Sequence, residues 1–243
     1  MTYRDSAPET AASKRQTSPR RRPRRSAEQS RQEILRAATA EFATHGLAGG
    51  RISRIVQKAG TNPRMIYEHF GSKSALYVAT LESALAALRA EELALDVDHL
   101  DPLEGLLQLF DFMNGHFERN GHLVSLLRTE NLMKARYMKK SSRIHEMSSP
   151  VLSMTERLLS RGVAEGKLAA DIDPLRLYVM IAALSQFHLA NVHTLSSMFE
   201  HDLSKPEWRA ERRADARLML ASYLSRKQMN DLSELFGAKE SSV

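Results

Sequence analysis

The segment AGTNPRMIYEHFGSKSALY, residues 59–77, constrains the fold more than any other part of the chain. Two glycines, Gly60 and Gly71, interrupt a helical pattern within it, and glycine readily ends a helix in a left-handed conformation. Asn62 follows the first glycine and can cap a helix, with the next proline at the first helical position. Ser72 can cap the helix that follows the second glycine. The spacing therefore predicts a very short helix between two sharp turns.

The flanking residues predict three more helices. Ser26 and Gln29 have the spacing of a capping box, which predicts a first helix that ends at Gly46. A second helix is expected between residues 50 and 59, and a long one from residue 73 toward residue 95. The buried face of the first helix is formed by Ile34, Leu35, Ala38 and Phe42.

Two short helices joined by a tight turn and followed by a long helix are the arrangement of a helix-turn-helix. Residues 27–81 resemble the N-terminal DNA-binding domain of the TetR family of regulators. The resemblance implies a helix-turn-helix domain over residues 27–72 that binds double-stranded operator DNA. It also implies a helical domain over residues 73–243 that binds a small effector and forms a homodimer. The residues that carry the resemblance are Ala59, Gly60, Ile66, Tyr67, His69, Phe70, Ser72, Lys73, Ala75 and Leu76.

Two departures from the family's pattern concern DNA recognition. The family usually has Thr or Ser before the second helix, whereas this chain has Gly49, Gly50 and Arg51, which weakens a helix cap. Recognition helices often begin with small or basic residues, whereas this one begins with Pro63 and Arg64. The proline removes a backbone donor that could have met a phosphate. The operator sequence of a relative therefore cannot be transferred to this chain.

Side-chain direction assigns roles within the short helix. Ile66 and Phe70 share one face, so we expect both in the core. Arg64 and Glu68 point away from that face. There, an arginine can donate two hydrogen bonds to guanine, and a glutamate can accept one from cytosine. The exposed face of this helix is therefore the predicted surface for base recognition.

Neighbouring residues are expected to support these contacts. Met65 and Thr61 can touch a thymine methyl group. By resemblance, Tyr67 and His69 contact phosphates, and Lys73 adds its ammonium to the positive end of a helix. A lone charged residue is usually only solvated, but here several converge on one short helix. The predicted DNA contacts are Arg51, Thr61, Asn62, Arg64, Met65, Tyr67, Glu68, His69 and Lys73.

The excess positive charge lies at the N-terminus. The net charge is +6, and residues 1–26 carry eight Lys and Arg against two acids, with almost no apolar side chains. This composition predicts a disordered basic arm. One interpretation is a solubilising tail or targeting segment, and the other is an arm that contacts phosphates or enters a minor groove. The candidate contacts of the arm are Arg20, Arg21, Arg22, Arg24 and Arg25.

Residues 100–243 contain helical patterns and no strand-like alternation, so the fold class is predicted to be all-α. Pairs such as Asp-Pro and Ser-Pro mark helix starts, and glycines mark breaks. By resemblance, the last two long helices form the dimer. The helices are expected near residues 102–119, 122–146 with or without a break, 150–165, 174–199, 206–226 and 228–236.

A weaker resemblance concerns the effector. Residues 166–192 are similar to the branch that contains pyrimidine-utilisation and nicotinate-responsive regulators, through Gly166, Leu168, Ile172, Asp173, Pro174 and Gln186. This implies a heterocyclic or aromatic acid as the effector. Gln186 is the first candidate contact, because an amide on a mostly apolar helix is costly to bury unless it is bonded. A hydrogen bond between two helices is the alternative for Gln186, and core packing is the alternative for the aromatic candidates. The other candidate wall residues are Phe112, His116, Glu130, Asn131, Tyr137 and His188.

Catalytic patterns do not converge, so we do not expect an enzyme. The chain has no cysteine, no His-Glu-x-x-His pattern and no glycine-rich phosphate loop. The histidines at 188 and 193 are five residues apart, which splays them on a helix. A metal site formed by the histidines at 116, 122, 188 and 193 is the alternative to capping or core roles, and neither a metal nor a cofactor is predicted. The apolar runs are too short to cross a bilayer and no signal segment is evident, so we expect a cytoplasmic protein without a membrane partner.

The sequence thus predicts a ligand-responsive, dimeric transcriptional regulator, a repressor that a small effector releases from a palindromic operator. The alternative is a DNA-binding structural protein or activator without a small-molecule effector. A closed apolar core in the second domain would favour that alternative.

Overall fold

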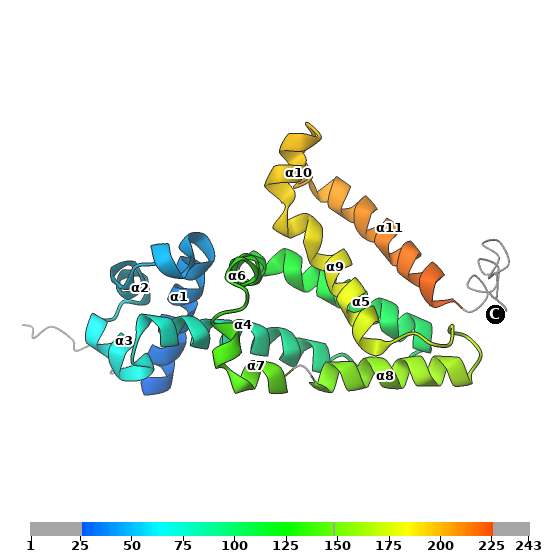
Figure 1. Cartoon of the computed structure of the whole chain (residues 1–243), viewed down its shortest axis with the longest axis horizontal. Coiled ribbons are helices and arrows are strands. Elements are labelled where there is room, and N and C mark those ends of the chain that lie inside the picture. The colour runs from blue at the N-terminus through cyan, green and yellow to red at the C-terminus, as the bar shows by residue number, and fades with distance from the viewer. Residues whose placement is uncertain (1–25, 148, 226–243) are drawn as a thin grey trace, which may run out of the picture.

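A computed structural model describes residues 26–147 and 149–225, and this part of the chain is helical without a strand. The all-α prediction is confirmed, while the arm at residues 1–25 and the helix expected at 228–236 lie outside the described residues. One end of the molecule consists of α1, α2 and α3, and α4 runs from this end into the remainder (Figure 1). The helices are α1 (Ala27–Gly49), α2 (Ile52–Ala59), α3 (Pro63–Phe70), α4 (Lys73–Leu93), α5 (Pro102–Arg119), α6 (Gly121–Leu132), α7 (Ser142–Glu146), α8 (Ser149–Ala164), α9 (Pro174–Ala190), α10 (Val192–Met198) and α11 (Pro206–Leu224), with a 3-10 turn at Met138–Lys140.

The first three helices and the start of α4 enclose one core, which we call the head. The predicted capping box is present, because Ser26 and Gln29 each bond to the other's backbone. The helix expected to end at Gly46 instead kinks there, where φ is 62°, and continues to Gly49. Gly50 then passes so close to Phe42 that an added Cβ would lie 2.7 Å from its ring. Both glycines therefore allow the chain to turn tightly from α1 into α2.

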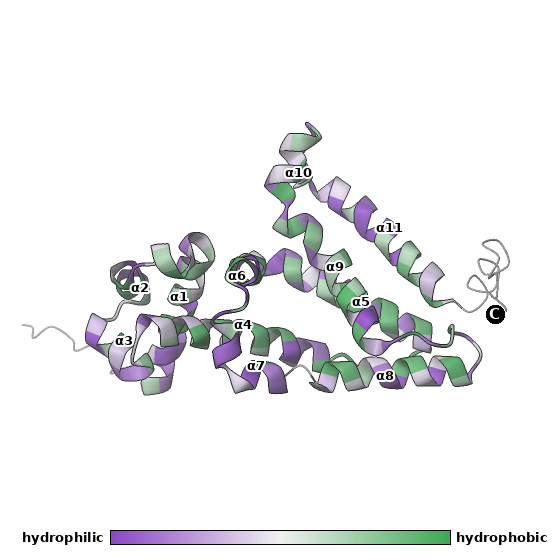
Figure 2. Ribbon diagram, in the orientation of Figure 1, coloured by the Kyte–Doolittle hydropathy of each residue, from purple (hydrophilic) through white to green (hydrophobic). Residues whose placement is uncertain are grey.

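The long helix α4 belongs to two cores. Leu76, Tyr77 and Leu81 lie in the head core, whereas Leu85 and Leu88 lie in the core of the remaining helices, which we call the body. Green apolar positions recur along α4, α5, α8 and α9, as expected for helices that pack on a shared core (Figure 2). One continuous helix thus connects the head to the body.

Two of the expected helices are interrupted. Residues 122–146 form α6, the 3-10 turn and α7, because Lys134 and Ala135 have positive φ angles of 55° and 56°. Residues 174–199 form α9 and α10, which meet at Asn191. The ends of α4 and α11 differ from the predictions by two residues each, which is the usual uncertainty of helix ends.

The segment that runs from the end of α6 into α7 packs on the head although it follows the head by some sixty residues in sequence. Met133, Tyr137, Met138 and Ile144 are partly buried against the head core. The rings of Tyr137 and Tyr77 meet edge to face with centroids 5.4 Å apart. The head core is therefore also covered by residues that lie far along the chain from α1, α2 and α3.

Candidate nucleic-acid interface and ligand cavity

The recognition helix α3 is fixed at both ends by local hydrogen bonds. The Asn62 side chain accepts from the Met65 N–H at 3.1 Å, and the Gly71 N–H donates to the Tyr67 carbonyl at 2.8 Å. Ile66 is fully buried, and Phe70 is partly buried with the Arg31 guanidinium 4.9 Å from its ring centroid. The expected inward face of α3 is therefore the face that packs on the head.

The opposite face of α3 carries an ion pair that is open to solvent. Arg64 Nε donates to Glu68 Oε1 at 2.6 Å, and the two side chains are 85% and 47% exposed. Tyr67, on the same short helix, is 52% exposed. This surface offers an arginine, a carboxylate and a phenol to a partner.

Other predicted DNA contacts are less accessible. Met65 is half-buried against the head core, and His69 is half-buried, its Nε2 buried without a hydrogen-bond partner in the described part of the chain. Thr61 is half-buried, and the Asn62 oxygen is engaged as the cap. Lys73 extends its Nζ to within 3.5 Å of the Ala48 carbonyl at the end of α1. These residues surround the exposed face of α3 rather than form it.

The start of α2 is held by a residue that sequence reasoning missed. The Arg51 side chain makes no capping hydrogen bond at the start of α2, as the departure from the family's pattern predicts. Its N–H instead donates to Glu41 Oε1 at 2.9 Å, and Arg54 Nε donates to the same oxygen at 2.7 Å. The hydrogen bond from Arg54 lowers the pKa of Glu41 against the opposing effect of burial. An acid seven residues after Ile34, on the apolar stripe of α1, was the signal in the sequence.

A cavity of about 200 Å³ lies in the body, next to the head. Gln186, the first candidate contact, is half-buried and lines it. Met138 and Ile144 line it as well, and both also pack on the head core. The walls of this cavity therefore include residues that also pack on the head core.

The polar side of the cavity is formed by two residues that bond to a buried acid behind them, an arrangement that the sequence did not reveal. Arg89 and Tyr178 line the cavity, and Arg89 Nη1 donates to the Tyr178 hydroxyl at 2.5 Å and also bonds to Glu92. The Tyr178 hydroxyl donates to Glu92 Oε1 at 3.0 Å. Glu92 is fully buried, so desolvation raises its pKa, while Arg89 and Tyr178 oppose that rise. The paired charges leave this wall close to neutral.

The remaining candidate wall residues lie elsewhere among the described residues. Glu130 is buried, and its Oε2 accepts from the N–H groups of Tyr137 and Met138 at 3.1 and 3.0 Å. His116 is buried with Nδ1 3.0 Å from Glu91 Oε2. These contacts hold loops and helices together.

Three further candidates have separate surroundings. Phe112 packs against the body core with its ring 5.7 Å from that of His116. Asn131 is exposed at the end of α6. His188 is 4% exposed, and its ring lies 6.2 Å from Trp208. The structure thus brings Gln186 alone of the seven candidates to this cavity.

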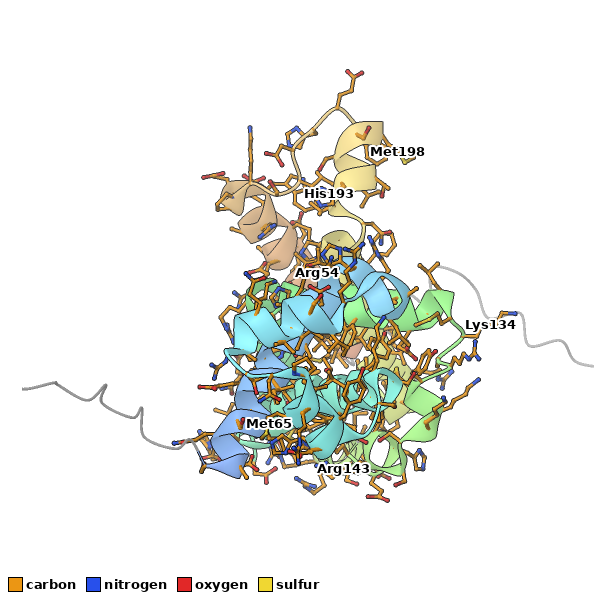
Figure 3. The ribbon with its side chains drawn as sticks, turned by 90° about the vertical axis from the view of Figure 1, so that its left-hand side faces the viewer. Arg54, Met65, Lys134, Arg143, His193 and Met198 are labelled. Atoms are coloured by element: carbon orange, nitrogen blue, oxygen red, sulfur yellow. The ribbon has the colours of Figure 1, made fainter. Side chains whose placement is uncertain are left out.

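Residues 26–147 and 149–225 hold no group of three or more metal-binding side chains. In the same part of the chain, none of the helices combines the length and the apolar character needed to span a bilayer. Arg54 and Met65 lie in the head, whereas His193 and Met198 lie on α10 in the body (Figure 3).

The fold and the α3 surface define a helix-turn-helix transcriptional regulator. Residues 34–80 match the family model "Bacterial regulatory proteins, tetR family", and residues 102–219 match the model of a tetracyclin repressor-like C-terminal domain. The chain belongs to the TetR family and is not an enzyme.

Individual relatives agree with this assignment. The chain is 35% identical over 185 residues to the HTH-type transcriptional repressor NicS of Pseudomonas putida, across 76% of this chain and 87% of NicS. It is 29% identical over 147 residues to the repressor AcnR of Corynebacterium glutamicum, across 59% and 71% of the two chains. The fold is similar to that of the ketosteroid transcriptional regulator KstR2 of Mycobacterium tuberculosis, with a TM-score of 0.60, 22% identity and coverage of 80% and 94%.

Proposed function

We propose that the protein is a dimeric repressor that binds an inverted-repeat operator and releases it when a small effector enters the Gln186 cavity. The observation that carries this proposal is the course of α4. One end of α4 begins at Lys73 beside the recognition helix, and Arg89 near its other end lines the cavity. A ligand that favours one tilt of α4 changes the separation of two recognition helices without touching DNA.

Base recognition is assigned to the exposed face of α3. Arg64 must leave Glu68 to reach a base, and an exposed ion pair of this spacing is worth only about 0.3–0.5 kcal/mol. A bidentate contact with guanine contributes about 1–3 kcal/mol of discrimination, so the base contact prevails. Tyr67, His69 and Lys73 are assigned to phosphates. The supporting contacts are Arg51, Thr61, Asn62 and Met65.

The basic arm is proposed to add phosphate contacts. Deleting residues 1–25 is then expected to reduce affinity and to flatten its salt dependence, because each lost phosphate contact removes about 0.9 from the log–log slope. Affinity measured at several salt concentrations decides between the two interpretations. An unchanged slope identifies the arm as a solubilising tail.

Dimerisation is assigned to α9 and α11. Leu175 and Val179 on α9 are 55% and 56% exposed, and Leu218 and Met219 on α11 are 68% and 63% exposed. Apolar positions on both helices are visible in green (Figure 2). Rows of exposed apolar residues mark interfaces, and a two-fold dimer predicts half-sites about 34 Å apart, or a multiple of that distance.

The effector is proposed to be small, because the cavity measures about 200 Å³. Its wall offers the Gln186 amide and the Tyr178 hydroxyl beside methionine and aromatic side chains. A heterocyclic compound or an aromatic acid suits this lining. Since Arg89 is already paired with Glu92, the charge balance favours a neutral heterocycle.

The test begins with genome-wide mapping of bound sites, which supplies the operator and the neighbouring genes. Compounds related to those genes are then tested for release of labelled operator, measured by fluorescence anisotropy. Gln186→Ala should weaken the response at unchanged DNA affinity, while Gln108→Ala, on α5 outside the cavity wall, should respond normally. An intact response of Gln186→Ala would remove this residue from the site. If no compound releases the operator, the structural protein or effector-independent activator becomes the better interpretation.

A further inference from the structure

A second cavity, of about 250 Å³, lies between the end of α5, α6, the end of α9, α10 and the start of α11. Of the residues lining it, Phe117 is the one that also lines the Gln186 cavity. Val124 and Leu189 continue the apolar side of the second cavity. His193, which lines it, lies on α10, and α10 is well separated from α1, α2 and α3 of the head (Figure 1). The two cavities therefore have different surroundings although they share one wall.

Two arginines face the apolar side. Arg128 donates from Nη1 to the Ala190 carbonyl at 3.2 Å, which holds its guanidinium at the rim. Arg209 is half-buried, and its Nε is buried without a hydrogen-bond partner among the described residues. A buried donor without a partner is costly, and a bound acceptor removes that cost.

The surrounding charges leave this region cationic. Glu118 is the acid in the wall, and its Oε1 accepts from the Asn114 amide at 3.0 Å. Arg212 lies within electrostatic range of Glu118 and balances its charge. Neither ring nitrogen of the buried His188 has a partner in the described part of the chain. Burial lowers the pKa of His188 to about 4, and the nearby charges of Arg212 and Arg209 lower it further.

The first turn of α6 adds to this field. Gly121, which begins α6, lines the cavity, and no side chain caps this helix start. The backbone N–H groups of a first helical turn carry partial positive charge and favour anions. Two arginines and an uncapped helix start thus surround one side of a cavity whose other side is apolar.

We propose that this second cavity binds a small organic carboxylate. The carboxylate lies between Arg209 and Arg128, and a compact apolar body, such as a single ring, packs on Phe117, Val124 and Leu189. Charge-assisted hydrogen bonds from arginine suit a carboxylate, and the volume suits a ligand smaller than a drug molecule. This site is additional to the effector cavity and does not depend on the assignment of Gln186.

The single tryptophan of the chain is a built-in reporter. Trp208 precedes Arg209 and lies 6.2 Å from the His188 ring, so its fluorescence senses charge and packing beside the cavity. The full-length protein is titrated with benzoate, with benzamide as a neutral compound of the same shape, and with inorganic phosphate as an anion without an apolar body. Benzoate should change the fluorescence saturably, while benzamide and phosphate should bind at least about tenfold more weakly.

Variants separate this site from its surroundings. Arg209→Gln should weaken benzoate binding about tenfold or more, measured by calorimetry because the change lies beside the reporter. Arg213→Gln is the matched control, since Arg213 on the same helix is bonded to Asp111 at 2.8 Å. If Arg209→Gln fails to fold, benzoate binding is measured with Arg128→Gln instead, which changes the arginine at the rim of the cavity. Gln186→Ala should leave the benzoate titration unchanged.

Four results would overturn the proposal. The first is no saturable benzoate binding at millimolar concentrations, and the second is equal affinity for benzoate and benzamide. The third is benzoate binding that is undiminished in both Arg209→Gln and Arg128→Gln. The fourth is loss of benzoate binding in Gln186→Ala. The last result would place benzoate in the effector cavity instead.

Discussion

The buried carboxylate of Glu41 holds the start of α2, so Glu41→Ala tests how the helix-turn-helix is built. Its Oε1 accepts from the Arg51 N–H at 2.9 Å and from Arg54 Nε at 2.7 Å. Truncation removes an acceptor that replaces the missing cap of α2 and leaves Arg54 without its acid. Glu41→Gln is the matched variant, because a glutamine keeps an acceptor oxygen at this position and loses only the charge.

The expected loss of unfolding free energy depends on how exposed the ion pair between Glu41 and Arg54 is. Loss of a helix cap costs about 1 kcal/mol. Breaking a fully buried ion pair costs about 3–5 kcal/mol, but Arg54 is 33% exposed and water can solvate part of its charge. We therefore expect Glu41→Ala to lose about 2–3 kcal/mol of unfolding free energy and Glu41→Gln about 1 kcal/mol. For a chain of this length the alanine variant should melt about 4–12 °C lower.

Acid pH provides a second readout. Arg54 lowers the pKa of Glu41 below its usual 4.5, so this interaction contributes stability above that pH and loses it as the pH falls through the lowered pKa. The difference in unfolding free energy between the wild type and Glu41→Ala should therefore become smaller as the pH falls. Thermal and urea unfolding followed by circular dichroism at neutral and acid pH measures both effects. If Glu41→Ala loses less than about 0.5 kcal/mol of unfolding free energy at neutral pH, the level of an ordinary surface substitution, this account of how α2 is held is refuted.

Three further predictions concern recognition, assembly and pH. Arg64→Ala should change the preferred sequence in selections from randomised DNA, whereas Lys73→Ala should weaken binding to all sequences, since base contacts specify and phosphate contacts position; an unchanged preference would exclude Arg64 from base readout. Val179→Lys should convert the dimer to a monomer at micromolar concentration in light scattering, while Leu132→Lys, at another exposed apolar position, should not; a monomeric wild type would contradict the dimer itself. The pKa of His188 is lowered from 6.5 to about 4, so the folded protein keeps this side chain neutral while the unfolded chain takes up a proton. The unfolding free energy should therefore fall by up to about 3 kcal/mol as the pH drops from 6.5 to 4. Urea unfolding of His188→Leu should lack this pH-dependent loss.

The local sequence determined the helices because helix starts depend on residues within one turn. Asn62 caps α3 through Met65, Ser72 caps α4 through Ala75, and Asp173 caps α9 through Arg176, each three residues away. Helical periodicity likewise placed Ile66 inward and Arg64 outward. The helix-turn-helix and the all-α class could therefore be predicted without knowledge of the packing.

Contacts between distant segments were decided only by the tertiary structure. Glu41 meets an N–H ten residues away, and Arg89 on α4 meets Tyr178 on α9, 89 residues away. Periodicity gives the direction of a side chain around its own helix, but not the neighbouring helix that packs there. A buried polar group on an apolar helix needs a partner or a cavity; Gln186 lines a cavity, whereas Glu130 meets the same need by holding the backbone of a loop. Whether a buried polar group lines a cavity or bonds to a backbone depends on where the helices break and how they cross. Both depend on the packing of the whole chain.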